Sequence, residues 1–152
     1  MDRGFFEIGI CAGKCPQNLG TLWRTAYQLG AAGLFTIGHR YSRQPSDTPH
    51  VARHIPLRQY VGWDEFVAVV PEKTLLVAVE MGGCNLPTFI HPERAIYILG
   101  AEDTGLPEDV LRSCSNVVSL PSVGHNSYNV AVAGALVMYD RNIKRNVFAK
   151  VA

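Results

Sequence analysis

Short apolar runs alternate along the chain with segments of helical periodicity. Five runs are apolar at nearly every position, which is typical of strands in a parallel sheet covered on both faces. These predicted strands are Phe5–Ile10, Leu34–Ile37, Leu75–Val79, Ala95–Leu99 and Val117–Leu120. Helical spacing predicts four helices, over Leu19–Ala31, Trp63–Val69, Pro107–Ser113 and Tyr128–Val147. The alternation predicts an α/β fold, with a mostly parallel sheet flanked by helices.

The composition is that of a folded domain. Of 152 residues, 47% are hydrophobic and 18% are charged, which argues against a disordered chain. No apolar run approaches the ~18 residues of a membrane helix, and the first residues lack the apolar core of a signal peptide. We therefore expect a single domain over residues 1–152, in the cytoplasm and away from membranes. The cysteines are expected to be free thiols, and no metal site is predicted: Cys11, Cys15, Cys84 and Cys114.

Basic residues gather in two stretches, although the net charge is only +1. Any contact with nucleic-acid phosphates must therefore be local. The first stretch, Gly38–Arg58, is rich in turn formers and contains four arginines: Arg40, Arg43, Arg53 and Arg58. The second is the C-terminal tail, with Arg141, Lys144, Arg145 and Lys150. Each stretch could bind phosphates, or be a solvated loop and a solvated helix end whose cations suit the helix dipole.

Polar residues form a first cluster between Asn18 and Gly30. At about 100° per residue, one arc of the predicted helix carries Thr21, Arg24, Thr25 and Gln28. Asn18 occupies the expected N-cap position. Taken alone, this cluster is an ordinary amphipathic helix with a capping asparagine.

A second cluster follows the strand that ends at Leu99. Gly100 and Gly105 bracket an acidic turn, at the carboxyl end of a strand where parallel sheets bind ligands. The turn imitates a phosphate-binding loop, but no Lys-Ser or Lys-Thr follows it. Glu102 and Asp103 would also repel phosphate. A positively charged ligand fits better than a triphosphate, and a plain strand-to-helix turn is the alternative.

The third cluster joins the strand at Val117–Leu120 to a long helix rich in small residues. Its apolar positions share a helical spacing with one arginine: Val130, Ala133, Gly134, Val137, Met138 and Arg141. Asn126 or Ser127 could be simply the N-cap of this helix.

In order, the clusters read Asn-x-Gly-x-x-x-Arg-x-x-x-x-x-Gly, then Leu-Gly-x-Glu-x-x-Gly-Leu, then Leu-Pro followed by Ser-x-Asn-Val-x-Val-Ala. Together they resemble the three motifs of the SpoU-type RNA ribose 2′-O-methyltransferases of the SPOUT superfamily. The resemblance spans about Phe5 to Asp140 and is similar to the minimal TrmL-like members. Departures are Asp103-Thr104, Tyr128, and the absence of the usual Met after Pro121.

The resemblance implies a C-terminal trefoil knot and methyl transfer from S-adenosylmethionine to a ribose 2′-hydroxyl in RNA. tRNA is favoured, at the wobble position of the anticodon loop. The implied cofactor-binding residues are Ala78, Val79, Leu99, Gly100, Leu120, Ser127 and Asn129. The implied catalytic residues are Arg24, Asn18, Glu102, Ser127 and Asn129.

Arg24 is the key catalytic residue implied by the resemblance, either as general base or as an electrostatic and positioning group. A guanidinium is effectively always protonated, which favours the second role. Asn18, Ser127 and Asn129 would position Arg24 and the ribose, and Glu102 would orient Arg24 or Asn18.

The expected partners are RNA and a second copy of the chain, without DNA or membranes. The homodimer would bury the helix that starts at Leu19 and the C-terminal helix. No separate RNA-binding domain is expected, so RNA contacts fall to the two basic stretches: Arg40, Arg43, Arg53, Arg58, Arg141, Lys144 and Arg145.

Two alternatives come from other functional classes. One is an inactive RNA-binding or assembly module with the same fold, against which the presence of Arg24, Glu102, Ser127 and Asn129 argues. The other is a nucleotide-dependent oxidoreductase. That class needs Gly-x-Gly-x-x-Gly after the first strand, where this chain has Cys-Ala-Gly-Lys-Cys-Pro at positions 11–16.

Overall fold

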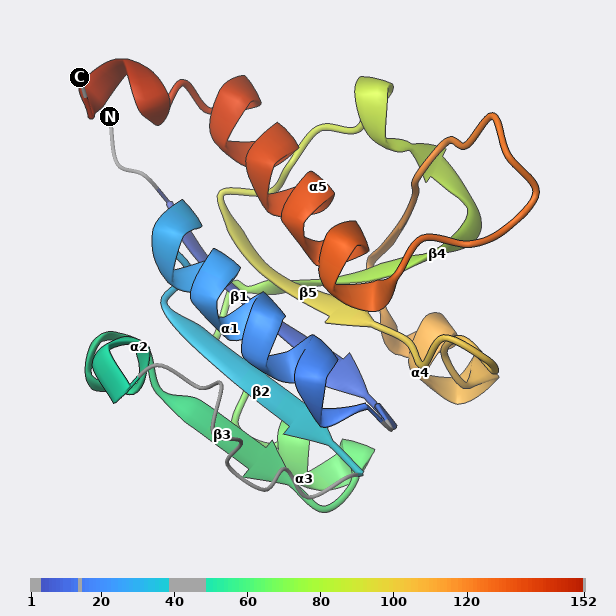
Figure 1. Cartoon of the computed structure of the whole chain (residues 1–152). Coiled ribbons are helices and arrows are strands. Elements are labelled where there is room, and N and C mark those ends of the chain that lie inside the picture. Colours follow the sequence, from blue (N-terminus) through green and yellow to red (C-terminus); the bar gives the residue numbers. More distant parts are fainter. Residues whose placement is uncertain (1–3, 14, 39–48, 152) are drawn as a thin grey trace.

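The structure is a computed structural model that describes the backbone of residues 4–13, 15–38 and 49–151. Its centre is a six-stranded sheet in the order β3-β2-β1-β5-β4-β6 (Figure 1). Every neighbouring pair in this sheet is parallel, so the predicted α/β class is confirmed. The strands are β1 (Phe5–Cys11), β2 (Gly33–Ile37), β3 (Leu57–Tyr60), β4 (Leu75–Asn85), β5 (Arg94–Leu99) and β6 (Asn116–Ser119).

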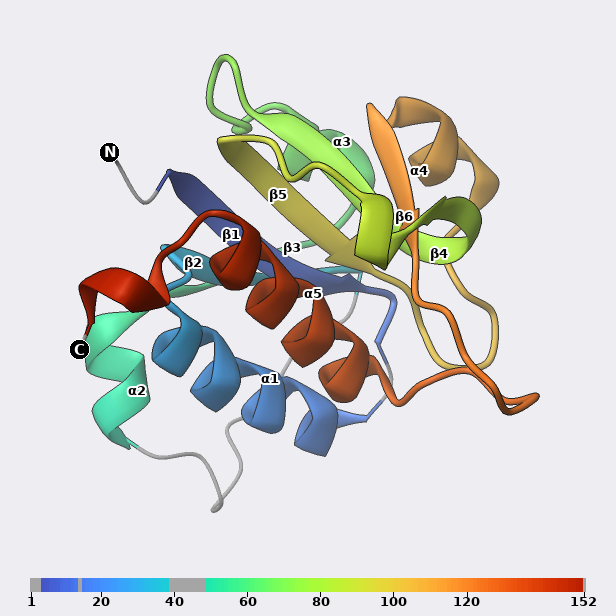
Figure 2. The same cartoon turned by 90° about the horizontal axis from the view of Figure 1, so that it is seen from above.

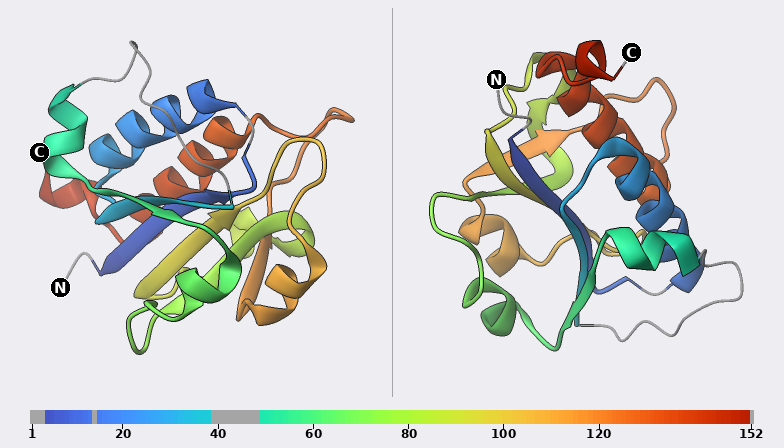
Figure 3. Two further views of the ribbon diagram at one scale, coloured as in Figure 1. Left: turned by 90° about the horizontal axis from the view of Figure 1, so that it is seen from below. Right: turned by 90° about the vertical axis from the view of Figure 1, so that its left-hand side faces the viewer.

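Helices cover both faces of the sheet. α1 (Pro16–Leu29), α2 (Pro49–His54) and α5 (Val130–Lys144) lie on one face. α3 (Trp63–Val67) and α4 (Glu108–Ser113) lie on the other (Figures 2 and 3). Two 3-10 turns complete the described elements, η1 (Leu86–Thr88) and η2 (Phe148–Lys150). None of the helices described here is long and apolar enough to cross a membrane.

The layers leave a hydrophobic core on each side of the sheet. α1 and α5 lie side by side above one core, where Gly134 permits close packing (Figure 2). A Cβ at Gly134 would lie only 2.5 Å from Cδ1 of Leu22, so a larger residue would displace the Leu22 side chain in the core. The second core packs against α3 and α4 and includes Phe35, Phe66 and Val110. β2 and β5, which lie between the cores, are therefore apolar and buried at nearly every position.

Two predicted helix starts are wrong. α1 begins at Pro16 with Cys15 as its N-cap, so Asn18 lies inside the first turn and does not cap the helix. Proline suits the first helical position because it lacks the amide hydrogen that would be unpaired there. α5 begins at Val130, and its N-cap is Asn129, neither Asn126 nor Ser127.

The stretch Gly38–Arg58 is not only a loop, because it contains α2 and the first residues of β3. β4 is longer than predicted. It pairs with Val118 of β6 at Val79 and again at Cys84, so residues 80–83 form an excursion from the ladder. α5 ends at Lys144, three residues before the predicted Val147, and the other predicted boundaries agree with the structure within two residues. The trefoil knot stays a prediction.

Candidate functional site

A cavity of about 510 Å³ lies at the carboxyl ends of β5 and β6 and at the excursion of β4 after Val79. We call it the larger cavity. Its walls come from residues 79–82, residues 99–105 and the segment after β6, with Val130 and Ala133 of α5 below. This is the edge at which parallel α/β sheets bind ligands, and the volume suits a small organic molecule.

Five of the residues implied for cofactor binding line the larger cavity: Val79, Leu99, Gly100, Leu120 and Ser127. The structure does not bring the other two to its walls. Ala78 is fully buried in the core beneath α3 and α4. Asn129 instead joins a hydrogen-bond network at the edge of the cavity.

That network links three residues far apart in the sequence. Oε1 of Glu102 accepts hydrogen bonds from Nδ2 of Asn18 at 2.9 Å and from Nδ2 of Asn129 at 3.0 Å. Nδ2 of Asn129 also donates to Oδ1 of Asn18 at 2.9 Å. The amide of Asn129 is fixed at its other end, because its Oδ1 caps α5 by accepting from the backbone of Ala131 and Val132. α1, the turn after β5 and the start of α5 therefore meet at one point.

A smaller cavity of about 240 Å³ adjoins this network, because Asn18 and Glu102 are among its lining residues. We call it the smaller cavity, and its lining is Ile10, Gly13, Cys15, Asn18, Ala101, Glu102, Asp103 and Val130. Residues 101–103 and Val130 line both cavities. The acidic turn is thus a wall that the two cavities share, and we call it the partition.

The partition is a tightly closed turn. Ala101 and Gly105 form an antiparallel bridge, in which the amide of Gly105 donates to the carbonyl of Ala101 at 2.9 Å. Gly105 has a φ of +66°, which favours glycine. A Cβ at Gly100 would lie 2.6 Å from the carbonyl carbon of Gly105, so only glycine lets the two ends of the turn approach.

Glu80 is a site residue that the sequence analysis missed. It lines the larger cavity, and its Oε2 accepts from the amide of Leu106 at 2.9 Å. The available signal was its position, because an acid directly after an apolar strand of a parallel sheet stands at the ligand-binding edge. With Glu102 and Asp103 it gives the larger cavity three carboxylates, and no lysine or arginine is among its described lining residues.

Arg24 is exposed on α1 and is absent from the described linings of both cavities. Six helical positions separate it from Asn18, which turns the two side chains about 120° apart around the helix. The structure therefore brings Asn18, Glu102 and Asn129 together and leaves Arg24 outside their network. Ser127 is exposed on the wall of the larger cavity.

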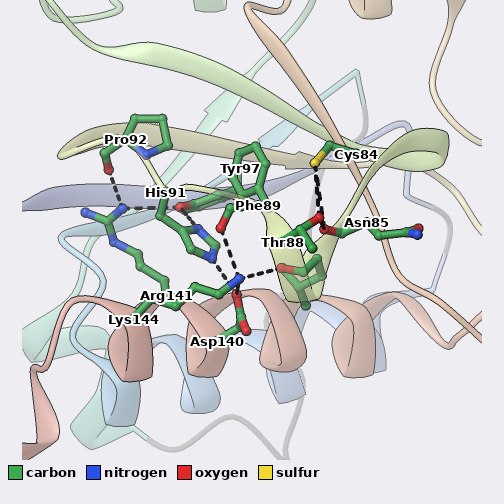
Figure 4. Close-up of polar contacts among 11 residues, drawn as sticks. Cys84, Asn85, Thr88, Phe89, His91, Pro92, Tyr97, Asp140, Arg141 and Lys144 are labelled. Carbon is green, nitrogen blue, oxygen red and sulfur yellow. Dashed lines mark hydrogen bonds and ion pairs between the residues drawn. The ribbon is translucent and has the colours of Figure 1, made fainter.

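The prediction that Arg141 binds RNA is wrong. Only 1% of this residue is exposed, and its guanidinium is used inside the protein (Figure 4). It donates to the carbonyls of Pro92 and Glu93 and to the hydroxyl of Tyr97 at 3.2 Å. The buried guanidinium thus has its hydrogen-bond partners within the protein.

A polar chain continues from Tyr97 toward the end of α5 (Figure 4). Nε2 of His91 lies 2.8 Å from Oδ2 of Asp140, and Nδ1 lies 2.7 Å from the Tyr97 hydroxyl. A carboxylate only accepts, so Nε2 carries the hydrogen and Nδ1 accepts from the tyrosine. Burial lowers the pKa of His91, against the opposing effect of Asp140. Lys144 pairs with Asp140 at 2.7 Å and donates to the carbonyls of Leu86 and Phe89.

The remaining basic residues differ in exposure. Arg53 is exposed on α2, whereas Arg145 is half-buried. Arg58 is half-exposed but forms an ion pair with Glu7 at 2.7 Å. Arg40 and Arg43 lie outside the described residues. Arg53 is thus the described arginine of the first stretch that is most open to a phosphate.

The model of the SpoU rRNA Methylase family matches residues 8–139 of the chain. An uncharacterized tRNA/rRNA methyltransferase of Archaeoglobus fulgidus is 27% identical over 132 residues, which are 81% of this chain and 58% of that protein. A tRNA (cytidine(34)-2′-O)-methyltransferase of Ancylobacter novellus is 28% identical, over 88% of this chain and 89% of that protein. A 23S rRNA (uridine(2479)-2′-O)-methyltransferase of Streptomyces viridochromogenes is 27% identical, over 82% of this chain and 48% of that protein. The chain spans little more than half the length of the Archaeoglobus protein and of a TrmH-family relative from Staphylococcus saprophyticus.

Solved structures share the fold. The SpoU methyltransferase AviRb from Streptomyces viridochromogenes, in complex with AdoMet, aligns with a TM-score of 0.83 at 23% identity, over 97% of this chain and 63% of that one. A structure described as giving insights into the 2-OH methylation of C/U34 on tRNA aligns with a TM-score of 0.79 at 25% identity. That alignment covers 96% of this chain and 99% of the other.

Proposed function

The chain belongs to the SpoU rRNA Methylase family, and we propose that it methylates a ribose 2′-hydroxyl in RNA with S-adenosylmethionine as the methyl donor. The observation that carries this proposal is the pair of cavities that share the Glu102 turn as a wall. Transfer between two bound molecules requires a donor site and an acceptor site that touch, and alignment of the reacting atoms supplies much of the rate. The shared partition gives the chain two such sites.

The larger cavity fits the donor. Val79, Leu99 and Leu120 offer an apolar surface at the strand ends, and the carboxylates of the cavity favour a cation. When bound, S-adenosylmethionine supplies a methyl group on a positively charged sulfonium. The AviRb structure that shares this fold is a complex with AdoMet, which supports the same cofactor here.

The smaller cavity fits the acceptor nucleoside. Its carboxylates, Glu102 and Asp103, disfavour a phosphate but accept hydrogen bonds from uncharged hydroxyl and amino groups. Asn18 is held by Glu102 through one hydrogen of its amide, which leaves the other for a ligand. The phosphate next to the acceptor ribose would then lie outside the cavity.

Arg24 fits the role of binding that outer phosphate. Its guanidinium matches phosphate geometry and can stabilise the charge that develops on the attacking oxygen. Because a guanidinium stays protonated, Arg24 is assigned to positioning and electrostatics and not to proton abstraction. An exposed arginine outside both cavities is where such a contact would be made.

We also propose that a second copy of the chain covers α5. The outward face of α5 carries apolar side chains at helical spacing, each exposed by 40% or more: Val132, Leu136, Tyr139 and Ile143. Such a stripe is self-complementary across a two-fold axis. It begins three residues after Asn129, so the interface would border the site and bring α1 of each copy toward the other. Light scattering should give a dimer, and Leu136→Asp should give a monomer.

The proposed substrate is the wobble ribose of a tRNA anticodon loop. The two relatives whose names or descriptions mention position 34 of tRNA are covered by this chain over 89% and 99% of their length. The 23S rRNA enzyme is covered over only 48%. A cytoplasmic location, where tRNA is used, goes with this proposal. An inactive RNA-binding module is disfavoured, because binding RNA alone does not require a network such as Asn18–Glu102–Asn129.

Two measurements test the proposed function. S-adenosylhomocysteine should bind the purified protein and raise its melting temperature, because a ligand of the folded state stabilises it. Nucleoside mass spectrometry should find one 2′-O-methyl group missing from tRNA of a deletion strain and restored by the purified enzyme. Absence of binding at millimolar S-adenosylhomocysteine would exclude the cofactor. Methylation of a base, or of a nucleotide in a paired stem, would exclude the substrate.

A further inference from the structure

Glu80 stands where β4 leaves the sheet. Residues 80–83 form the excursion of this strand, since Val79 before it and Cys84 after it both pair with Val118. The first three residues of the excursion line the larger cavity. Glu80 therefore belongs to one wall of that cavity, and the acidic turn after β5 forms another wall.

Both carboxylate oxygens of Glu80 accept backbone hydrogens. Oε1 accepts from the amide of Met81 at 3.0 Å, and Oε2 accepts from the amide of Leu106 at 2.9 Å. Oε2 also lies against Gly105, where a Cβ would be 2.6 Å from it. Hydrogen bonds to an ionised carboxylate are stronger than those between neutral groups. Glu80 thus ties the excursion of β4 to the far end of the turn.

The turn held in this way also carries Glu102. Its near end continues from β5, and its far end is fixed by the Ala101–Gly105 bridge and by Glu80. Glu102 extends from between these two fixed points to Asn18 and Asn129. The position of the partition between the cavities therefore depends on Glu80, although Glu80 does not contact the network itself.

We propose that Glu80 is a positioning residue for the methyl donor, an assignment that rests on the proposed function. Its carboxylate sets the separation between the β4 wall and the turn of the larger cavity. It acts through the backbone of Met81 and Leu106 and not through contact with the reacting atoms. Glu80 should then affect the affinity for adenosyl ligands equally, whether the sulfur of the ligand is charged or neutral.

Glu80→Gln tests this role at constant side-chain size. Glutamine has one oxygen and one donor group, so one of the two backbone hydrogen bonds is lost whichever way the amide is turned. Calorimetry should show affinity about tenfold weaker, the order expected for one hydrogen bond to a charged group. The loss should be equal for S-adenosylmethionine, which is a sulfonium, and S-adenosylhomocysteine, which is a neutral thioether. Glu80→Asp keeps the charge but shortens the reach to Leu106, so it should also lower the affinity for both ligands.

Glu108→Gln is the matched control. It removes the same charge at the start of α4, where the Glu108 side chain is 78% exposed and pairs with Arg112. Both affinities should stay at the wild-type value. Melting of the ligand-free variants shows that the proteins compared are folded.

The outcomes separate the explanations. A larger loss for the sulfonium than for the thioether would mean that the charge of Glu80 acts directly on the ligand, and would overturn the positioning role. Unchanged affinity in Glu80→Gln, or full affinity in Glu80→Asp, would overturn it as well. A wild-type protein that binds neither ligand would overturn the proposed function and this inference together, whereas the other results leave the proposed function standing.

Discussion

Replacing Asn129 by serine should separate two roles of one side chain. Oδ1 of Asn129 caps α5 through the amides of Ala131 and Val132, while Nδ2 donates to Asn18 and Glu102. Serine keeps an oxygen that can cap the helix but has no amide donors. We expect both Asn129→Ser and Asn129→Ala to lose methyl transfer, and Asn129→Ser to be the more stable of the two because it keeps the cap.

The expected magnitude follows from the cap. Replacing an N-cap asparagine with alanine costs about 1 kcal/mol, whereas serine caps about as well as asparagine. Both variants lose the donors of Nδ2, so that loss cancels when they are compared. Asn129→Ala should therefore unfold about 1 kcal/mol more easily than Asn129→Ser in urea. For a chain of this size that difference is roughly 2–4 °C in melting temperature.

Methyl transfer is measured on the same two proteins with labelled S-adenosylmethionine and tRNA. Asn116→Ser is the control, because Asn116 is exposed at the opposite, amino end of β6 and should tolerate the same change. If Asn129→Ser is as unstable as Asn129→Ala, the capping argument is refuted. If Asn129→Ser transfers methyl groups at the wild-type rate, the network has no part in the reaction.

Three further predictions address other parts of the molecule. Arg24→Ala should lose nearly all methyl transfer but bind S-adenosylhomocysteine as the wild type does, since Arg24 lines neither cavity; Arg24→Lys should also be poor because an ammonium lacks the guanidinium fork. Substantial transfer by Arg24→Ala would remove this residue from the mechanism. Burial lowers the pKa of His91. The neutral His91 side chain therefore stabilises the fold fully above its unfolded pKa of about 6.5, and this stabilisation is lost as the pH falls through the lower pKa of the folded state. On acidification, the urea midpoint of His91→Gln should fall less steeply than that of the wild type. Equal slopes of midpoint against pH would contradict this role of His91. Bound RNA should protect Cys15, which lines the smaller cavity, from a thiol reagent that still modifies the exposed Cys84. S-adenosylhomocysteine should give Cys15 no such protection. Modification of Cys15 in the presence of RNA would mean that the RNA binds elsewhere.

The strands were predictable where the sheet is covered on both faces. Five of them are continuous apolar runs, because every position in such a strand meets a core. β3 was missed because it is an edge strand, in which Arg58 and Gln59 are exposed and no apolar run forms. It also lies in a stretch of turn formers, where local composition favours a loop. The start of α1 was misplaced although Pro16, a common first helical residue, was a usable signal.

The site was predictable only in part. The motif resemblance named Asn18, Glu102 and Asn129, but no local pattern shows that three distant segments meet. Arg141 was misassigned because a basic residue in a basic tail suggests exposure. Its helical spacing with Met138 already placed it on the buried face of α5. The carbonyls that accept its hydrogen bonds belong to a distant segment before β5, which only the folded chain brings near.

The packing of α5 has a consequence for biosynthesis. This helix follows all six strands and α1 along the chain, and Gly134 seats it against Leu22 of α1. As the polypeptide leaves the ribosome, the apolar face beneath α5 stays open to water until residues 130–144 have emerged, which exposes the nascent chain to aggregation and to chaperones. Asn129 caps this same helix and completes the hydrogen bonds to Glu102. Closure of the core and completion of this hydrogen-bond network are therefore one event, and a nascent chain stalled before it has neither.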